Sequence, residues 1–165
     1  MLHPSATIVT GAQSEVLRAK TAKVSNPLAP EIQALIPEMF EMMHQADGLG
    51  LAAPQIDLAL RLCVIEIEGD KMVFINPQLT SLSREKIIFE EGCLSLPGQF
   101  LPIERSERVT VRFQDEHGAD RKIKASGLLA IALQHEVDHL DGILIVDRYK
   151  KQKIKHYDLT HQSVL

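Results

Sequence analysis

Hydrophobic residues recur at helical spacing in an early segment of the chain, residues 32–43. Side chains three and four positions apart share one face of a helix, so this spacing predicts a helix with a single apolar stripe. The stripe consists of Ile32, Leu35, Ile36, Met39, Phe40 and Met43. Pro37 interrupts it, and an interior proline costs roughly 3 kcal/mol because it removes a hydrogen bond and crowds the preceding turn. We therefore expect a kink at Pro37 or a later start of the helix.

A second helical pattern lies near the end of the chain. Its apolar positions are Leu128, Ile131 or Ala132, Leu133 and Val137. Ser126 stands before the pattern as a candidate cap, and Gly142 stands after it, where a glycine can end a helix.

The chain between these two patterns favours short strands. Residues 62–67 and 72–75 are rich in β-branched side chains and are bounded by turn-forming residues. Residues 108–114 alternate between apolar and polar side chains, and residues 115–118 make a plausible hairpin turn to a strand at 121–124. The order helix, strands, helix favours an α+β fold over an alternating parallel-sheet fold.

Length and composition narrow the class of protein. The chain has 165 residues, of which 45% are hydrophobic and 24% charged, which favours one soluble domain over residues 1–165. No apolar run is longer than residues 128–133, so no membrane-spanning helix is expected. The first five residues have neither a basic start nor an apolar core, so no secretory signal is expected.

Charge and cysteine content further limit the class of protein. The formal net charge of −4 does not suggest a general nucleic-acid binder, whose surface would be strongly basic. The only cysteines are Cys63 and Cys93, so we do not expect a disulfide framework. We expect a reducing, cytoplasmic setting.

The strongest chemical signal lies on the second predicted helix, in residues 134–140. His135 and His139 are four positions apart, so both imidazoles sit on one helix face and can reach one metal ion. Glu136, next to the first histidine, is placed to exchange protons with water at such a metal. The alternative is a helix that happens to carry two surface histidines. The pattern alone does not separate a protease from other metal-dependent hydrolases.

A catalytic metal site needs a third protein ligand. The candidates downstream are Asp141, Asp147, His156, Asp158 and His161, and they do not match the extended spacing of zincin-type proteases. Cys93 lies upstream in a Gly-Cys context where a thiolate could face a cleft. The alternative for a lone cysteine is a small buried hydrophobe, which is the interpretation we favour for Cys63.

A third segment, residues 48–55, places Gly48 and Gly50 in a short apolar stretch. The two glycines let another backbone approach closely, and Gln55 adds an amide donor. By itself the segment is also consistent with a flexible turn after the first helix.

Together, residues 48–55, 91–95 and 134–140 resemble the three signature motifs of the peptide deformylases, in the order found in that family. The resemblance extends over most of the chain from Leu17 to Asp147. The sequence departs from the family pattern in two places. Gln13-Ser14 stand where the family usually has Pro-Asp, and Phe100 stands where relatives often carry a basic residue. The fold that the resemblance implies is a single domain of short antiparallel strands packed around a central metal-binding helix, with an N-terminal helix, a C-terminal helix and a basic tail over about 148–165.

The resemblance implies hydrolysis of the formyl group from the N-terminal formyl-methionine of nascent polypeptides, with release of formate. It implies that Cys93, His135 and His139 hold one divalent metal ion, Fe2+ in vivo, for which Zn2+ or Ni2+ can substitute. Water on that metal would attack with Glu136 as general base and acid. Gln55 and the Leu94 backbone N–H would stabilise the oxyanion.

The resemblance also suggests where a peptide would lie. The peptide would lie against the Leu49-Gly50 backbone, and Gly92 would also bind substrate. The candidates for an apolar pocket that takes the methionine side chain are Leu49, Leu128, Ile131 and Ala132. Core packing is an equally good explanation for those last three residues. Asp138 would hold a partner such as Arg105, tying the helix to the loop after Pro97.

The basic C-terminal run suggests docking on the ribosome, although a solvated helix face would look the same. The run consists of Lys150, Lys151, Lys153 and Lys155. We expect no membrane partner, a monomer and a cytoplasmic location.

Two other functions fit parts of the pattern. One is a zincin-like metallopeptidase, against which the upstream cysteine weighs. The other is a catalytically silent metal-binding protein, against which Glu136 and Gln55 weigh, because neither would be needed to hold a metal.

Overall fold

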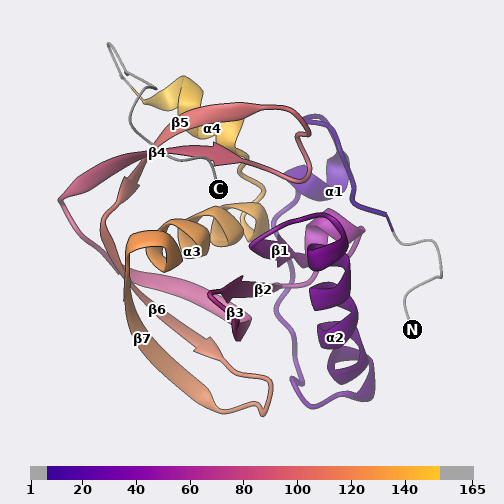
Figure 1. Ribbon diagram of the computed structural model, residues 1–165. Coiled ribbons are helices and arrows are strands. Elements are labelled where there is room, and N and C mark those ends of the chain that lie inside the picture. Colours follow the sequence, from indigo (N-terminus) through magenta and orange to yellow (C-terminus); the bar gives the residue numbers. More distant parts are fainter. Residues whose placement is uncertain (1–6, 153–165) are drawn as a thin grey trace.

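The computed structural model describes residues 7–152 (Figure 1). Its helices are α1 (Glu15–Arg18), α2 (Pro30–Gln45), α3 (Gly127–Leu140) and α4 (Ile145–Lys151), with a short 3-10 helix, η1, at Ala53–Ile56. Its strands are β1 (Gly50–Ala52), β2 (Leu62–Ile67), β3 (Asp70–Leu82), β4 (Lys86–Gly92), β5 (Phe100–Ser106), β6 (Arg108–Gln114) and β7 (Asp120–Ser126). All the strands pair antiparallel, so the predicted α+β class is confirmed.

The strands form two sheets with α3 between them. One sheet has the order β1-β2-β3-β6-β7, and the other is the two-stranded ribbon β4-β5. Figure 1 shows α3 running between the ribbon and the larger sheet. Because the first half of α3 is apolar on nearly every side, the helix can be covered by both sheets. Ala130 and Leu133 pack with Val109 and Val111 of β6 in one buried cluster.

The helix α2 begins at Pro30 and runs through Pro37, so the expected later start is wrong. All six residues of the predicted stripe are buried and pack against β1, β2 and β3. Burying a Leu, Ile or Phe side chain contributes about 1.5–3 kcal/mol, so several such contacts outweigh the cost of one interior proline. Pro30 occupies the first turn, where no backbone hydrogen bond is lost.

The ends of α3 partly follow the prediction. Ser126 occupies the N-cap position, but its side chain makes no capping hydrogen bond. Gly142 follows the helix with φ +73°, and a Cβ at this position would lie 2.4 Å from the Arg18 carbonyl oxygen. Only glycine fits both this left-handed conformation and the close approach of another backbone.

Two predicted strands match β2 and β6 residue for residue, whereas the predicted 72–75 strand is only part of β3. β3 continues past Pro77 because the ladder shifts register between Ile75 and Gln78. Asn76 lies at this shift in register and has a φ of +54°. Its side chain accepts a hydrogen bond from the Val24 N–H and donates one to the Val24 carbonyl. Among the described helices, none is long and apolar enough to cross a membrane.

Candidate active site

One turn of α3 brings His135 and His139 together, and Cys93, the residue that follows β4, joins them. The Cys93 Sγ lies 3.2 Å from His139 Nε2. One ligand atom from each of the three residues lies within 4.8 Å of the others, and this is the only such group of His, Cys, Asp or Glu within residues 7–152. The three predicted metal ligands are therefore brought together, although 46 positions separate Cys93 from His139.

Glu91 orients the first histidine. His135 Nδ1 lies 2.8 Å from Glu91 Oε2, which engages that nitrogen and leaves Nε2 available for a metal. Arg105 of β5 binds both oxygens of Glu91, at 2.6 and 2.8 Å. Burial alone would raise the pKa of Glu91, but the bonds from Arg105 and His135 outweigh it and lower the pKa to about 2. Glu91 is therefore an anion that fixes the imidazole ring.

The donor set suits a divalent transition metal. A thiolate and two imidazoles bind zinc, iron or nickel, and three protein ligands leave a coordination position open. Burial, followed by the nearby charge of His135, lowers the pKa of His139 and keeps it in the neutral form that ligates a metal. The residues present therefore fit a single metal ion.

Glu136 lies beside this group as a buried carboxyl without a full set of partners. Glu136 is 4% exposed to solvent, and its Oε2 accepts no hydrogen bond within the described chain. Burial raises the pKa of Glu136 to about 7. A carboxyl group with such a pKa can both take up and release a proton near neutral pH.

Gln55 and Leu94 supply hydrogen-bond donors close by. Gln55 is 1% exposed, and its Oε1 accepts the N–H of Ala52 at 2.9 Å. Its amide nitrogen therefore remains as the donor: it donates one N–H to the Ser95 hydroxyl oxygen at 3.3 Å and has a second N–H. The N–H of Leu94, in the turn after Cys93, donates to no acceptor in residues 7–152.

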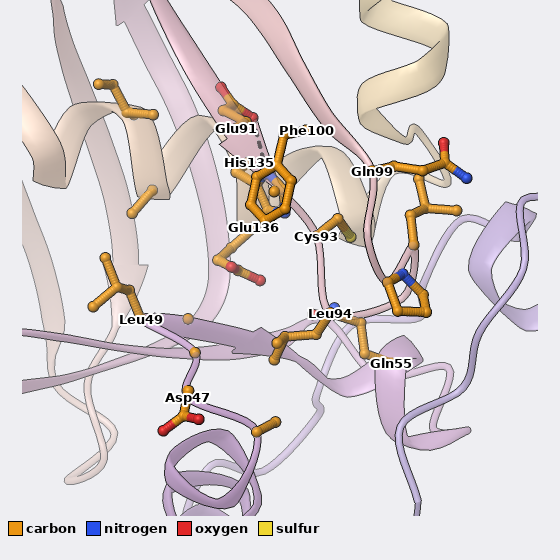
Figure 2. Close-up of a pocket in the computed structure, with 18 of the residues that line it drawn as sticks. Asp47, Leu49, Gln55, Glu91, Cys93, Leu94, Gln99, Phe100, His135 and Glu136 are labelled. Carbon is orange, nitrogen blue, oxygen red and sulfur yellow. Dashed lines mark hydrogen bonds and ion pairs between the residues drawn. The ribbon is translucent and has the colours of Figure 1, made fainter. Parts of the chain in front are cut away.

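These groups face one cavity of about 470 Å³ (Figure 2). Its lining includes all of the predicted substrate-contact residues, which are Leu49, Gly50, Gly92, Leu128, Ile131 and Ala132. Gln55, Cys93, Leu94, His135 and Glu136 also line it. Figure 2 shows Gln55 and Leu94 on one side of the cavity, across from His135 and Glu136. His139 is buried and is not part of the lining.

Sequence reasoning missed the role of Glu91. The only local signal is a carboxylate two positions before the candidate ligand Cys93, because its partner His135 lies 44 positions away. The predicted pair of Asp138 with Arg105 is present at 2.6 Å, but Arg105 belongs to β5, so the helix is tied to a strand rather than to the loop after Pro97.

The remaining candidate ligands lie elsewhere or outside the described residues. Asp141 pairs with Arg61 at 2.7 Å, and Asp147 pairs with Arg18. His156, Asp158 and His161 fall outside residues 7–152, as does His3. His44 and His117 are exposed, as predicted. Cys63 is fully buried, and burial raises its thiol pKa, which fits the prediction of a small core residue.

Known proteins match both the sequence and the fold. The chain is 42% identical over 140 residues to a peptide deformylase of Dictyoglomus thermophilum, covering 85% of this chain and 90% of the relative. It is 45% identical over 144 residues to a peptide deformylase of Thermodesulfovibrio yellowstonii, covering 84% of this chain and 86% of the relative.

The crystal structure of peptide deformylase from Thermotoga maritima superposes with a TM-score of 0.84 at 36% identity, covering 88% of this chain and 98% of that one. A peptide deformylase of Synechococcus elongatus in complex with actinonin also gives 0.84, at 40% identity, covering 90% of this chain and 81% of that one. The family model described as polypeptide deformylase matches residues 6–155. With this match across nearly the whole chain, and with Cys93, His135 and His139 gathered into one group of ligand atoms, the chain belongs to the polypeptide deformylase family.

Proposed function

We propose that this cavity binds the formylated N-terminus of a nascent polypeptide and that its residues catalyse removal of the formyl group as formate. The chain is a hydrolase of the deformylase family, whose members act on N-formyl-methionyl peptides. The observation that carries the proposal is that the Cys93–His135–His139 group lies at a cavity that is also lined by Glu136, whose buried Oε2 is unpaired within residues 7–152, and by the hydrogen-bond donors Gln55 and Leu94.

Cys93, His135 and His139 would hold the single metal ion. When bound, a divalent ion supplies Lewis-acid polarisation and lowers the pKa of water that it coordinates. We propose Fe2+ as the native ion, with Zn2+ or Ni2+ able to replace it, because the thiolate and imidazole donors accept all three.

Glu136 is proposed to hold and move the proton. Its carboxyl would take the proton from the attacking water and deliver it to the departing amine nitrogen. The Gln55 amide and the Leu94 N–H would donate hydrogen bonds to the oxygen of the formyl group as negative charge develops on it.

The peptide would lie along Leu49 and Gly50 as an added strand, since an extended backbone can pair with an exposed strand edge. Its methionine side chain would rest against Leu128, Ile131 and Ala132, which line the cavity. Gly92 also lines the cavity and is proposed to contact the peptide.

We further propose that residues 1–165 form one catalytic domain that acts as a cytoplasmic monomer. Docking on the ribosome through the basic C-terminal run remains part of the proposal. Lys150 and Lys151 lie at the end of α4, whereas Lys153 and Lys155 lie outside the described residues.

The test is formate release from a short formyl-methionyl peptide by the full chain, purified without oxygen and loaded with ferrous iron. A general acid–base group contributes about 100- to 10,000-fold, so Glu136→Ala should lose activity by that factor while it still binds metal. Glu41→Ala, on the exposed face of α2, is the matched control and should behave like the parent. Formate release by the chain loaded with Zn2+ or Ni2+ is measured beside that of the ferrous form, which compares the three metals.

Metal binding without formate release would contradict the proposal. Cleavage of unformylated internal peptide bonds would then favour the metallopeptidase, and no hydrolysis of either substrate would favour a silent metal-binding protein.

A further inference from the structure

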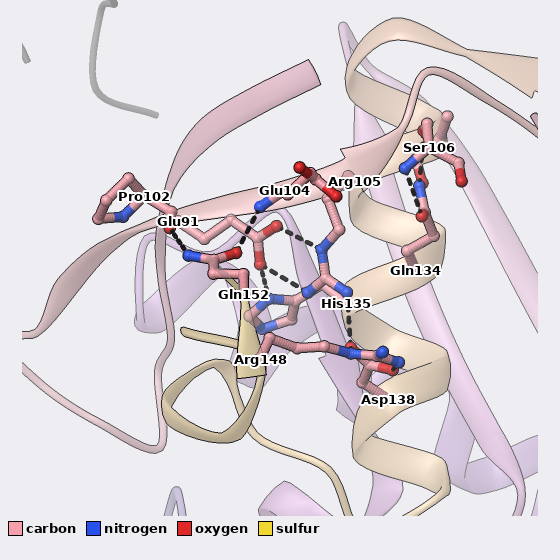
Figure 3. A network of polar contacts seen from close by, with 11 residues as sticks. Glu91, Pro102, Glu104, Arg105, Ser106, Gln134, His135, Asp138, Arg148 and Gln152 are labelled. Atoms are coloured by element: carbon pink, nitrogen blue, oxygen red, sulfur yellow. Dashed lines mark hydrogen bonds and ion pairs between the residues drawn. The ribbon is translucent and has the colours of Figure 1, made fainter. Parts of the chain in front are cut away.

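A chain of ionised side chains runs from the C-terminal helix α4 to His135 (Figure 3). It begins with Arg148 on α4, passes through Asp138 of α3 and Arg105 of β5, and reaches His135 through Glu91 of β4. Four separate elements therefore meet in one network. The three middle members are each at least nine-tenths buried.

The Asp138 carboxylate accepts three hydrogen bonds within the described chain, and two of them come from Arg148. Its Oδ2 accepts from Arg105 Nη1 at 2.6 Å and from Arg148 Nε at 2.9 Å. Its Oδ1 accepts from Arg148 Nη2 and from no other donor in the described chain. Removal of Arg148 would leave one oxygen of a buried carboxylate without a partner.

With His135 in the neutral form that binds a metal, the charges of the network balance only when Arg148 is included. Arg105 is shared, because its Nε and Nη2 bind Glu91 while its Nη1 binds Asp138. With Arg148 present, two guanidinium groups face two carboxylates. Without it, one guanidinium must serve both carboxylates, and a buried charge without compensation is strongly unfavourable.

We propose that Arg148 is a positioning residue for His135: by holding Asp138, it keeps Arg105 seated on Glu91, which fixes the imidazole. The inference rests on the proposed role of His135 as a metal ligand. When Arg148 is absent, Arg105 is drawn toward Asp138, the clamp on Glu91 loosens, and His135 Nδ1 loses its fixed acceptor.

Other contacts already anchor α4 to the fold. Asp147 pairs with Arg18, the last residue of α1. The Gln152 side chain accepts from the Glu104 N–H at 2.8 Å and donates to the carbonyl of Pro102. Arg148 is 43% exposed as a side chain, yet its guanidinium turns inward to Asp138. Arg148 is therefore not the only residue that attaches the helix.

The test is a cobalt titration of the metal-free full chain, read by the thiolate-to-cobalt charge-transfer absorption and by competition with a chelator. Loss of a residue that orients a ligand costs about 10- to 100-fold in metal affinity, and we expect at least the lower value for Arg148→Met. Simple long-range electrostatics predicts the opposite sign, because removing a positive charge favours a bound cation.

Two further variants separate positioning from attachment. Asp138→Asn combined with Arg148→Met leaves Glu91 and Arg105 as a balanced pair, so cobalt affinity should return toward that of the parent. Arg18→Met removes the other ion pair of α4, so it should lower the unfolding temperature without changing cobalt affinity.

Unchanged or tighter cobalt binding by Arg148→Met would overturn the inference, as would a double variant no better than the single one. If the parent chain itself gave no charge-transfer band, the ligand set proposed above would fail instead.

Discussion

At the scale of single residues, two side-chain atoms of the site are buried without a partner in residues 7–152: Glu136 Oε2 and His139 Nδ1. Buried polar atoms are nearly always hydrogen-bonded, so an unpaired carboxyl oxygen in a cavity is available to substrate or water. The unpaired Oε2 of Glu136 is therefore consistent with the proposed exchange of a proton with water or substrate. Nothing in the structure explains the unpaired Nδ1 of His139.

The orientation of Gln55 leads to a prediction about its amide nitrogen. Gln55→Glu keeps the acceptor for the Ala52 N–H but replaces the amide donor by a carboxylate oxygen. Loss of one donor to a developing oxyanion typically costs about 100- to 1000-fold in turnover, so kcat for formate release should fall by that factor. Metal content and unfolding temperature are measured beside it, and a kcat equal to that of the parent would exclude Gln55 as a donor.

At the scale of elements, the approach of β1 to α3 places the carboxyl of Glu136. A Cβ on Gly50 would lie 2.3 Å from Glu136 Oε1 and 2.9 Å from its Cδ. Gly50 is therefore needed for close packing of a strand against the functional side chain rather than for an unusual backbone conformation.

Gly50→Ala should displace the Glu136 carboxyl and lower kcat while the unfolding temperature changes little. A misplacement of about 1 Å can cost on the order of 100-fold in rate. Gly48→Ala is the matched control in the same segment, because its Cβ would come too close only to the flexible end of the Leu94 side chain, at 2.8 Å, and its next contacts, from 3.4 Å, are ordinary van der Waals contacts. Steady-state assays of both variants that gave equal kcat would show that Gly50 does not position Glu136.

The elements also show where local patterns fail to predict structure. The apolar stripe of α2 was readable because its period is local, and packing against the sheet then overrode the propensity of Pro37. The ribbon β4-β5 was missed because Glu90 and Glu91 disfavour a strand by local preference. Glu91 is tolerated there only because Arg105 arrives from β5 and neutralises it.

At the scale of the whole molecule, Asp147 joins the two ends of the described chain. It accepts the Leu144 N–H at 2.8 Å and pairs with Arg18. Burial would raise its pKa, but these two contacts outweigh burial and lower the pKa below the ordinary value of 3.8. The folded state therefore favours the carboxylate. This contribution to stability is complete above the ordinary pKa and is lost as the pH falls through the lower folded value.

Asp147→Asn should therefore destabilise the chain at neutral pH, and its disadvantage relative to the parent should shrink as the pH falls below about 4. Urea unfolding of both proteins between pH 3 and pH 7 measures the difference. Asp120→Asn, at an exposed position without an ion pair in the described chain, should show no such trend. A disadvantage that stayed constant with pH would contradict the assignment.

The sequence by itself determined what depends on local spacing. The period of the apolar residues predicted α2 and α3, the alternation predicted β6, and the four-residue interval placed His135 and His139 on one face. The three motifs also identified Cys93 and Gln55 as members of one site, through a resemblance rather than through geometry.

Only the tertiary structure decided which distant groups meet and how their charges are compensated. Glu91 reaches His135 across 44 positions of the chain. Arg148 of α4 completes the buried network through its contact with Asp138 of α3. Such contacts have no local signature, because a buried charge is stable only when its partner arrives from another element. The sequence therefore identified the groups that are proposed to carry the chemistry, whereas the folded chain set the orientation of each of them.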